Sequence, residues 1–109
     1  MKFSKVFPLL IAKAVRKGRT EEEVFAVTGW LTGYSEEELR ALLGSDSATY
    51  GEFLEKAPCM NPERFHVKGK ICGVRVEEIE DSRMRDLRIL DKLVDDLAKG
   101  KPLDKILPT

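Results

Sequence analysis

The chain has 109 residues, of which 42% are hydrophobic and 35% are charged, and its 19 basic residues balance 19 acidic ones. This length predicts one domain with a hydrophobic core. The zero net charge excludes a global basic field for nucleic acid or anionic lipid, and no apolar run reaches the roughly 20 residues that span a bilayer.

Residues 6–12 are the most apolar stretch and imitate a secretory signal peptide. Basic residues follow this stretch at once, however, and no small-residue cleavage site appears. We therefore expect a cytoplasmic protein without a membrane anchor. In that reducing compartment Cys59 and Cys72 should be free thiols.

Four short helices are expected in the first half of the chain. Pro8 suits the first position of a helix at 8–17, because its missing N–H would be unpaired there anyway, and Gly18 ends it. Helices at 20–33, 35–44 and 49–56 follow. Each begins with a capping box, in which an N-cap hydroxyl residue and a glutamate three positions later satisfy each other's free backbone N–H: Thr20 with Glu23, Ser35 with Glu38, and Thr49 with Glu52.

The second half is expected to be helical as well. Asn61 and Pro62 predict the start of a fifth helix that reaches Cys72 and stops at Gly73. Residues 70–76 are the only strand candidate, but glycines beside and inside them favour a helix followed by a turn. Three elements complete the chain: a short helix at 76–80, a long helix at 82–99 and a last turn at 102–107. The long helix carries one apolar stripe: Met84, Leu87, Leu90, Val94 and Leu97.

An internal repeat relates residues 25–39 to residues 65–79, with identical residues at six of the fifteen positions. The shared pattern is a helix, a glycine turn and a second helix. Similar helix–glycine–helix corners could produce the same match without common architecture, and we favour the repeat. The sequence thus predicts an all-α fold: a small single-domain helical protein with two related helix-turn-helix corners and a long C-terminal helix.

The first corner has the spacing of a DNA-binding helix-turn-helix, with Gly29, Gly33 and the cap Ser35. A DNA reader presents the start of its second helix to bases and phosphates. Here that start is the acidic run 36–38, and the second copy has glutamates at 77 and 78. Because carboxylates repel phosphate, the sequence disfavours nucleic-acid binding and favours a packing corner.

Cys59, His66 and Cys72 carry the side chains that zinc prefers. Six residues separate the first pair and five the second, which matches no compact metal motif, and no fourth ligand is evident. The same three residues are weak candidates for nucleophilic catalysis, because no orienting group is evident. We expect ordinary thiols, an ordinary histidine and no cofactor.

The most basic stretch lies between Pro58 and Lys70. The start of a proline-opened helix could hold an anion there, because its free N–H groups point outward. The competing interpretation is a solvated helix face with a well-made cap. The candidate ligand or anion site consists of Asn61, Arg64, His66, Lys68, Trp30 and Tyr34.

Several motifs together resemble the bacterial domain of unknown function 2200 family: WLTGYS at 30–35, APxMNP at 57–62 and ICGVRVEEIED at 71–81. The resemblance covers nearly the whole chain. It implies a small, stand-alone, mostly helical cytoplasmic protein. It brings no activity, substrate, cofactor or catalytic residue.

The leading functional hypothesis is a non-enzymatic protein-interaction or regulatory module, because apolar corners and charged faces are abundant while a convergent polar site is not. It predicts a partner protein or self-association, with an interface on the long helix. The alternative is a small enzyme, or a ligand or metal binder, using the region of Cys59, His66 and Cys72.

Overall fold

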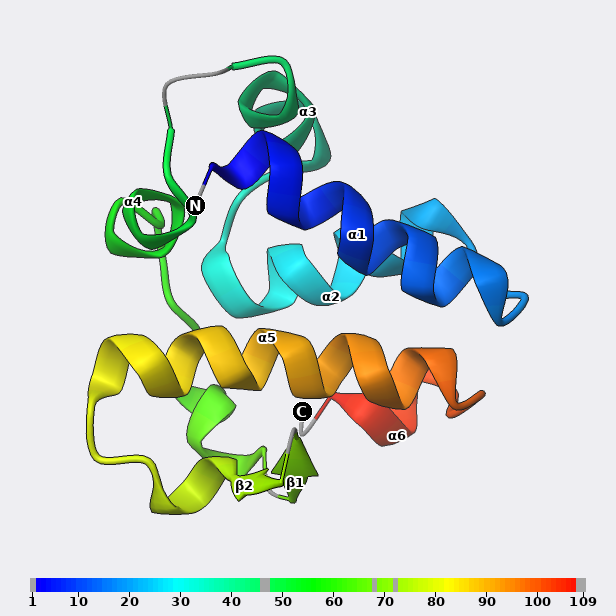
Figure 1. The fold of residues 1–109 in the computed structure, drawn as a ribbon, viewed down its shortest axis with the longest axis vertical. Helices are drawn as coiled ribbons and strands as arrows, with labels where there is room; N and C mark the ends of the chain where they lie inside the picture. The colour runs from blue at the N-terminus through cyan, green and yellow to red at the C-terminus, as the bar shows by residue number, and fades with distance from the viewer. Residues whose placement is uncertain (1, 46–47, 68, 72, 108–109) are drawn as a thin grey trace.

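The computed structural model describes residues 2–45, 48–67, 69–71 and 73–107. Helices dominate it, as Figure 1 shows, and the all-α class is confirmed. Among the described residues, no helix is both long and apolar enough to cross a bilayer. In chain order the elements are α1 (Phe3–Arg16), α2 (Glu21–Thr32), α3 (Glu36–Leu43), α4 (Tyr50–Glu55), the 3₁₀ helix η1 (Pro62–His66), β1 (Lys70–Ile71), β2 (Val74–Arg75), the 3₁₀ helix η2 (Val76–Glu78), α5 (Ser82–Ala98) and α6 (Leu103–Ile106).

Helix α1 begins at Phe3, and Pro8 lies inside it, so the predicted start at residue 8 is wrong. A proline inside a helix costs about 3 kcal/mol. Phe3 and Phe7 lie one turn apart, both fully buried, with ring centroids 4.9 Å apart. Burying each of them contributes roughly 1.5–3 kcal/mol, which offsets the proline. The Phe3 N–H also donates to the carbonyl of Ala48 (3.0 Å), which fixes the start of the helix.

The first corner follows the prediction. All three capping boxes of the first half are present, at the starts of α2, α3 and α4. Gly33 ends α2 with a φ of 81°, a left-handed conformation that favours glycine. Gly29 lies inside α2 where a Cβ would be 3.0 Å from the carbonyl oxygen of Tyr34, so its small size lets the turn close over the helix.

The second predicted corner is wrong. Only the 3₁₀ helix η1 follows Pro62, and β1 and β2 then form an antiparallel hairpin in which Lys70 faces Arg75. Gly69 has a φ of 120° and Gly73 a φ of 80°, and neither value occurs in an α-helix. The backbone therefore leaves the helical region twice within the expected helix–glycine–helix segment. The expected end of the fifth helix at Cys72 lies outside the described residues.

The long helix α5 confirms the prediction for 82–99 and packs against most other elements (Figure 1). It runs beside α1, in the same direction in that view, with α2 behind them. Its buried side chains join those of α1, α2 and α4 in one core. The largest fully buried side chains are Phe3, Phe7, Phe53, Leu31, Leu39, Ile89, Leu90, Leu93 and Leu97.

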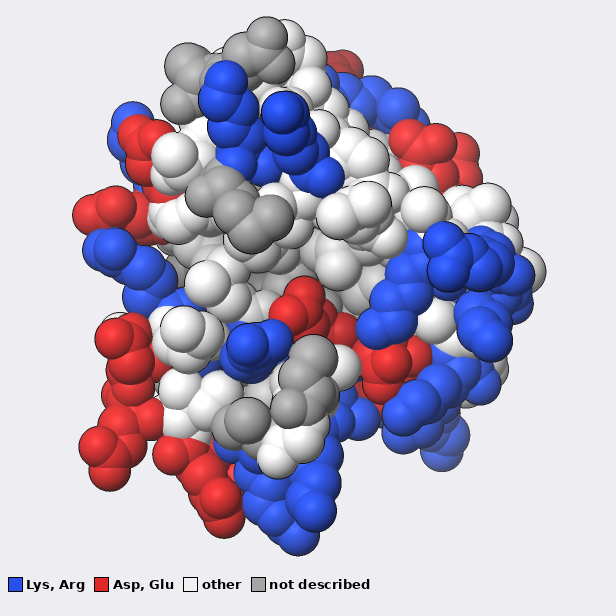
Figure 2. Space-filling view, viewed as in Figure 1, with Lys and Arg blue, Asp and Glu red and all other residues white. Residues whose placement is uncertain are grey.

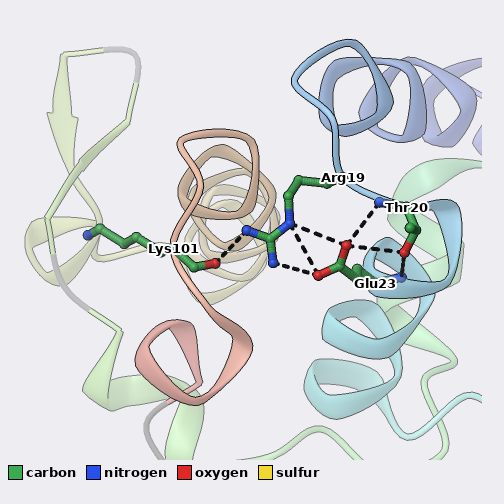
Figure 3. A network of polar contacts seen from close by, with 4 residues as sticks. All are labelled: Arg19, Thr20, Glu23 and Lys101. Atoms are coloured by element: carbon green, nitrogen blue, oxygen red, sulfur yellow. Dashed lines mark hydrogen bonds and ion pairs between the residues drawn. The ribbon is translucent and has the colours of Figure 1, made fainter.

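A polar clasp ties the C-terminal segment to the start of α2 (Figure 3). The Arg19 guanidinium lies between the carboxylate of Glu23 and the backbone carbonyl of Lys101, to which its Nη1 donates at 2.8 Å. Glu23 also accepts from the backbone N–H of Thr20 in the capping box (2.9 Å). One carboxylate therefore caps α2 and orients the arginine that holds the segment leading into α6.

Candidate functional site

The predicted anion site is largely occupied by contacts within the protein. Asn61 caps η1 through its Oδ1, which accepts from the Glu63 N–H at 2.9 Å. Arg64 donates from Nη1 to the Asn61 carbonyl (2.9 Å) and from Nε to the Asp86 carboxylate (3.0 Å). Its guanidinium also lies over the ring of Phe65. These groups fasten η1 to α5, and anion binding here stays a prediction.

The other described residues of that predicted site have contacts of their own. His66 is exposed and pairs with Glu63 at 3.2 Å. Tyr34 donates from its hydroxyl to the Phe53 carbonyl (2.8 Å), and burial raises the pKa of that hydroxyl. Trp30 is partly buried on α2 and packs against the core. The structure joins Asn61 and Arg64 directly. The Asn61 N–H also donates to the carbonyl of Leu31 on α2 (2.9 Å), next to Trp30, and Lys68 lies outside the described residues.

The predicted thiol and imidazole group is not assembled among the described residues. Cys59 is exposed, and its backbone N–H donates to the Thr32 carbonyl at 3.0 Å. Within that part of the chain, no three histidine, cysteine, aspartate or glutamate side chains lie close enough to hold a metal ion. Cys72 falls outside it, so a metal or nucleophilic site at these residues stays a prediction.

The α2–α3 corner presents its acidic run as expected. Glu36, Glu37 and Glu38 form the first turn of α3, and all three are exposed. Glu38 closes the capping box with Ser35, while Glu36 pairs with Arg40. A phosphate approaching the start of this helix would meet carboxylates, which supports the interpretation of the corner as a packing element.

A groove between α1 and α5 is the apolar hollow that sequence reasoning missed. Its cavity of about 310 Å³ is lined by Val6 of α1, Tyr50 of α4 and four residues of α5: Met84, Leu87, Arg88 and Asp91. We call it the α1–α5 groove. Met84 belongs to the apolar stripe predicted on the long helix, and it is 46% exposed.

Three polar side chains line the α1–α5 groove: those of Tyr50, Arg88 and Asp91. The hydroxyl of Tyr50 is buried, and among the described residues it has no hydrogen-bond partner. Burial, with the neighbouring charge of Asp91, raises the pKa of this hydroxyl far above its usual value, so it stays protonated. Burial likewise raises the pKa of the Asp91 carboxyl. Asp91 forms an ion pair with Arg88, Oδ2 to Nη1, at 3.6 Å.

The two ends of the groove differ in charge. Further along the helices Lys13 of α1 pairs with Asp95 of α5 at 3.1 Å and bridges the two walls. Figure 2 shows basic side chains over the start of α1, an uncharged surface over its middle, and a larger group of basic side chains where α1 and α5 both end. The α1–α5 groove beside α4 is therefore followed along α1 by a basic region at the C-terminal end of that helix.

The fold and the groove together define a small all-α protein with one apolar hollow on its longest helix. A family model described as "Uncharacterized protein conserved in bacteria (DUF2200)" matches residues 1–108. The chain belongs to this family, which confirms the resemblance found in the sequence.

One solved structure is also similar to the chain: "Crystal structure of uncharacterized protein SP1917". That protein is 53% identical, and the match covers 98% of this chain and 87% of that chain with a TM-score of 0.93. A search of curated proteins gives no match. These comparisons fix the family and the fold, and they assign no activity.

Proposed function

We propose that this protein is a non-enzymatic protein-interaction module, and that its α1–α5 groove receives an apolar side chain from a segment of a partner protein. The observation that carries the proposal is Met84, a large apolar side chain 46% exposed at a hollow of about 310 Å³. Methionine is common on surfaces that accept varied apolar partners, because its thioether is flexible and polarisable.

The polar groups of the groove suit a peptide. A protonated Tyr50 hydroxyl donates one hydrogen bond, and a backbone carbonyl beside the inserted side chain would accept it. Leaving a buried donor unpaired costs about 1–3 kcal/mol, so a partner that satisfies it gains specificity. Beside the Arg88–Asp91 ion pair, the groove thus offers an apolar hollow and the donor of Tyr50, two features that together recognise a side chain and its own main chain.

The expected affinity is modest. Burying one apolar side chain contributes roughly 1.5–3 kcal/mol, and association itself costs several kcal/mol in lost translational and rotational freedom. The hollow alone would therefore hold a partner only transiently. Contacts beyond the hollow must supply the rest of the binding free energy.

Selection from a displayed library of random peptides tests this function. We expect peptides with a large apolar residue to be enriched on the wild-type protein, and to lose at least about tenfold in affinity on Met84→Glu, since a carboxylate would sit in the hollow. Phe65→Glu is the matched control, because Phe65 is 45% exposed but does not line the groove. Peptides that bind the Met84→Glu and Phe65→Glu proteins equally well would contradict the proposal.

The cytoplasmic location belongs to the same proposal, and the burial of Phe7 supports it, because the apolar stretch 6–12 is then part of the folded core. Fractionation of cells that express the full chain tests it. Recovery of the protein with membranes or in the medium would overturn the location without touching the groove.

A further inference from the structure

We infer that the partner segment is acidic: its apolar anchor enters the α1–α5 groove, and its carboxylates reach the basic end of α1. This inference rests on the proposed function and names the chemistry of the partner. It concerns the surface of α1 from the hollow to the C-terminal end of the helix, whereas the proposed function concerns only the hollow.

The charges of the chain are divided unevenly. Residues 1–19 contain six basic residues and no acidic one, whereas residues 20–109 contain 13 basic and 19 acidic residues. The zero net charge therefore conceals a cationic N-terminal helix on an otherwise acidic protein. Local charge, not the sum over the chain, decides what a surface attracts at distances beyond contact.

Helix α1 presents this charge to solvent. Lys5, Arg16 and Lys17 are exposed, and their side chains form no ion pair with any described residue. Exposed apolar residues lie between them on the same helix, with Leu9 65% and Val15 50% exposed. The outer surface of α1 thus alternates cations with apolar side chains, which fits an acidic segment that also carries apolar residues.

Acidic residues near the basic end are already neutralised. Asp95 lies between Lys13 (3.1 Å) and Lys99 (2.9 Å). Asp96 pairs with Lys92 at 2.9 Å, and Lys101 lies 3.7 Å from the same oxygen. The carboxylates of α5 therefore do not cancel the exposed cations of α1, and the surplus at this end is positive.

The length of α1 sets the spacing in the partner. Val6, at the hollow, and Arg16, at the basic end, are ten residues apart. At 1.5 Å per residue this distance is about 15 Å along the helix. An extended chain rises about 3.3 Å per residue, so its acidic residues should lie about five positions from the apolar anchor.

A protein segment fits this surface better than a lipid bilayer. The apolar part is a hollow of about 310 Å³ lined by residues of three helices, a local feature of the size of a side chain. A bilayer is instead entered by a continuous apolar helix face, and the outer face of α1 is interrupted by cations. Charge complementarity and the hollow together select a short acidic segment with an apolar anchor.

The test uses the full-length protein and peptides selected on it, with binding measured at two salt concentrations. We expect the enriched peptides to carry Asp or Glu about five positions from the apolar residue. Their affinity should fall at least about tenfold on Arg16→Glu/Lys17→Glu. It should also fall, by a smaller factor, at the higher of the two salt concentrations. Lys70→Glu/Arg75→Glu is the matched control, because it makes the same change of charge on the hairpin, away from α1.

The outcomes separate the two proposals. Peptides with a neutral composition that lose affinity on Met84→Glu but not on Arg16→Glu/Lys17→Glu would overturn the acidic partner and leave the proposed function intact. Equal losses of affinity on Arg16→Glu/Lys17→Glu and on Lys70→Glu/Arg75→Glu would also overturn the acidic partner. Binding of the wild-type protein to phosphatidylglycerol vesicles, abolished by Arg16→Glu/Lys17→Glu, would replace the acidic segment by a membrane. A dimer dissociated by that same variant would replace it by a second copy of this chain.

Discussion

Residues 25–39 and 65–79 share six identities in fifteen positions and fold differently. The first segment is the second half of α2, a left-handed glycine and the start of α3. The second is the end of η1, a two-stranded hairpin and η2. The same spacing of phenylalanine, valine, glycines and glutamates therefore does not encode one structure.

The difference lies in what precedes and flanks the shared residues. A capping box at Thr20 starts a helix long enough to hold Gly29 in a helical conformation. The equivalent Gly69 follows only a five-residue 3₁₀ helix and has a φ of 120°. A glycine has little conformational preference of its own, so its neighbours decide whether it continues a helix or leaves it. The predictions below test this difference at equivalent positions.

The largest difference is expected at the paired phenylalanines. Phe25 is buried, with its ring centroid 5.7 Å from that of Phe7, so Phe25→Ala should lower the free energy of unfolding by about 3–5 kcal/mol. Phe65 is 45% exposed between Arg64 and Arg85, and Phe65→Ala should cost about 1 kcal/mol. Urea unfolding measures both. Equal losses would mean that the second segment belongs to the core as fully as the first.

The paired glycines come next. Gly33 has a positive φ, and a Cβ there would lie 2.9 Å from the backbone nitrogen of Cys59. That nitrogen donates to Thr32, so the loop cannot retreat, and Gly33→Ala should cost about 2–4 kcal/mol. At Gly73 the φ is also positive, but nothing lies within 4 Å, and Gly73→Ala should cost only about 1 kcal/mol. Thermal unfolding of both variants checks this, and a larger loss at Gly73 would contradict it.

The paired caps should differ less. The Ser35 side chain accepts from the Glu38 N–H at 3.1 Å, so Ser35→Ala should cost about 1 kcal/mol. Arg75, its equivalent, makes no side-chain cap hydrogen bond and has only an exposed ion pair with Glu77. Arg75→Ala should therefore change the free energy of unfolding by less than about 0.5 kcal/mol. Chemical denaturation in parallel measures the pair, and a cost at Arg75 as large as at Ser35 would refute the assignment of caps.

Sequence motifs of a few neighbouring residues predicted the fold well where one local interaction determined the structure. The capping boxes at Thr20, Ser35 and Thr49 were confirmed because each is complete within four residues. The prediction failed where distant contacts decided the outcome. Pro8 lies inside α1 because Phe3 and Phe7 are buried against residues such as Phe53, which is far away in the sequence.

The α1–α5 groove was harder to predict than the fold. Its residues come from three helices. The spacing of apolar residues within one helix does not show which part of its apolar stripe the neighbouring helices leave exposed. Met84 belonged to the predicted stripe and is nevertheless 46% exposed. The positive charge along α1 can be read from the sequence, because residues 1–19 contain no acidic residue. It becomes visible only when charges are counted segment by segment and not over the whole chain. The interface predicted on the long helix stays a proposal, which we assign to the part of α5 from Met84 to Asp91.

The smallest expected effect is a pH dependence at the start of the first corner. Hydrogen bonds from Arg19, and then from Thr20, lower the pKa of Glu23 from 4.5 to about 2. A carboxyl whose pKa is lower in the folded state stabilises the fold above pH 4.5, and this contribution is lost as the pH falls toward 2. Glu63, the equivalent residue, instead pairs with His66 on an exposed turn. Glu23→Gln should therefore flatten the decline of the free energy of unfolding between about pH 4.5 and 2.

Urea unfolding at a series of pH values measures that decline, and an NMR titration of the Glu23 carboxyl locates its pKa. Arg19→Met is the informative second variant, because it removes the main cause of the shift and should return the pKa of Glu23 toward its ordinary value. The clasp on the Lys101 carbonyl would be lost in the same variant, loosening the C-terminal segment. A wild-type decline identical to that of Glu23→Gln would show that the carboxylate of Glu23 gains nothing from the corner, and that the cap depends on the Thr20 hydroxyl alone.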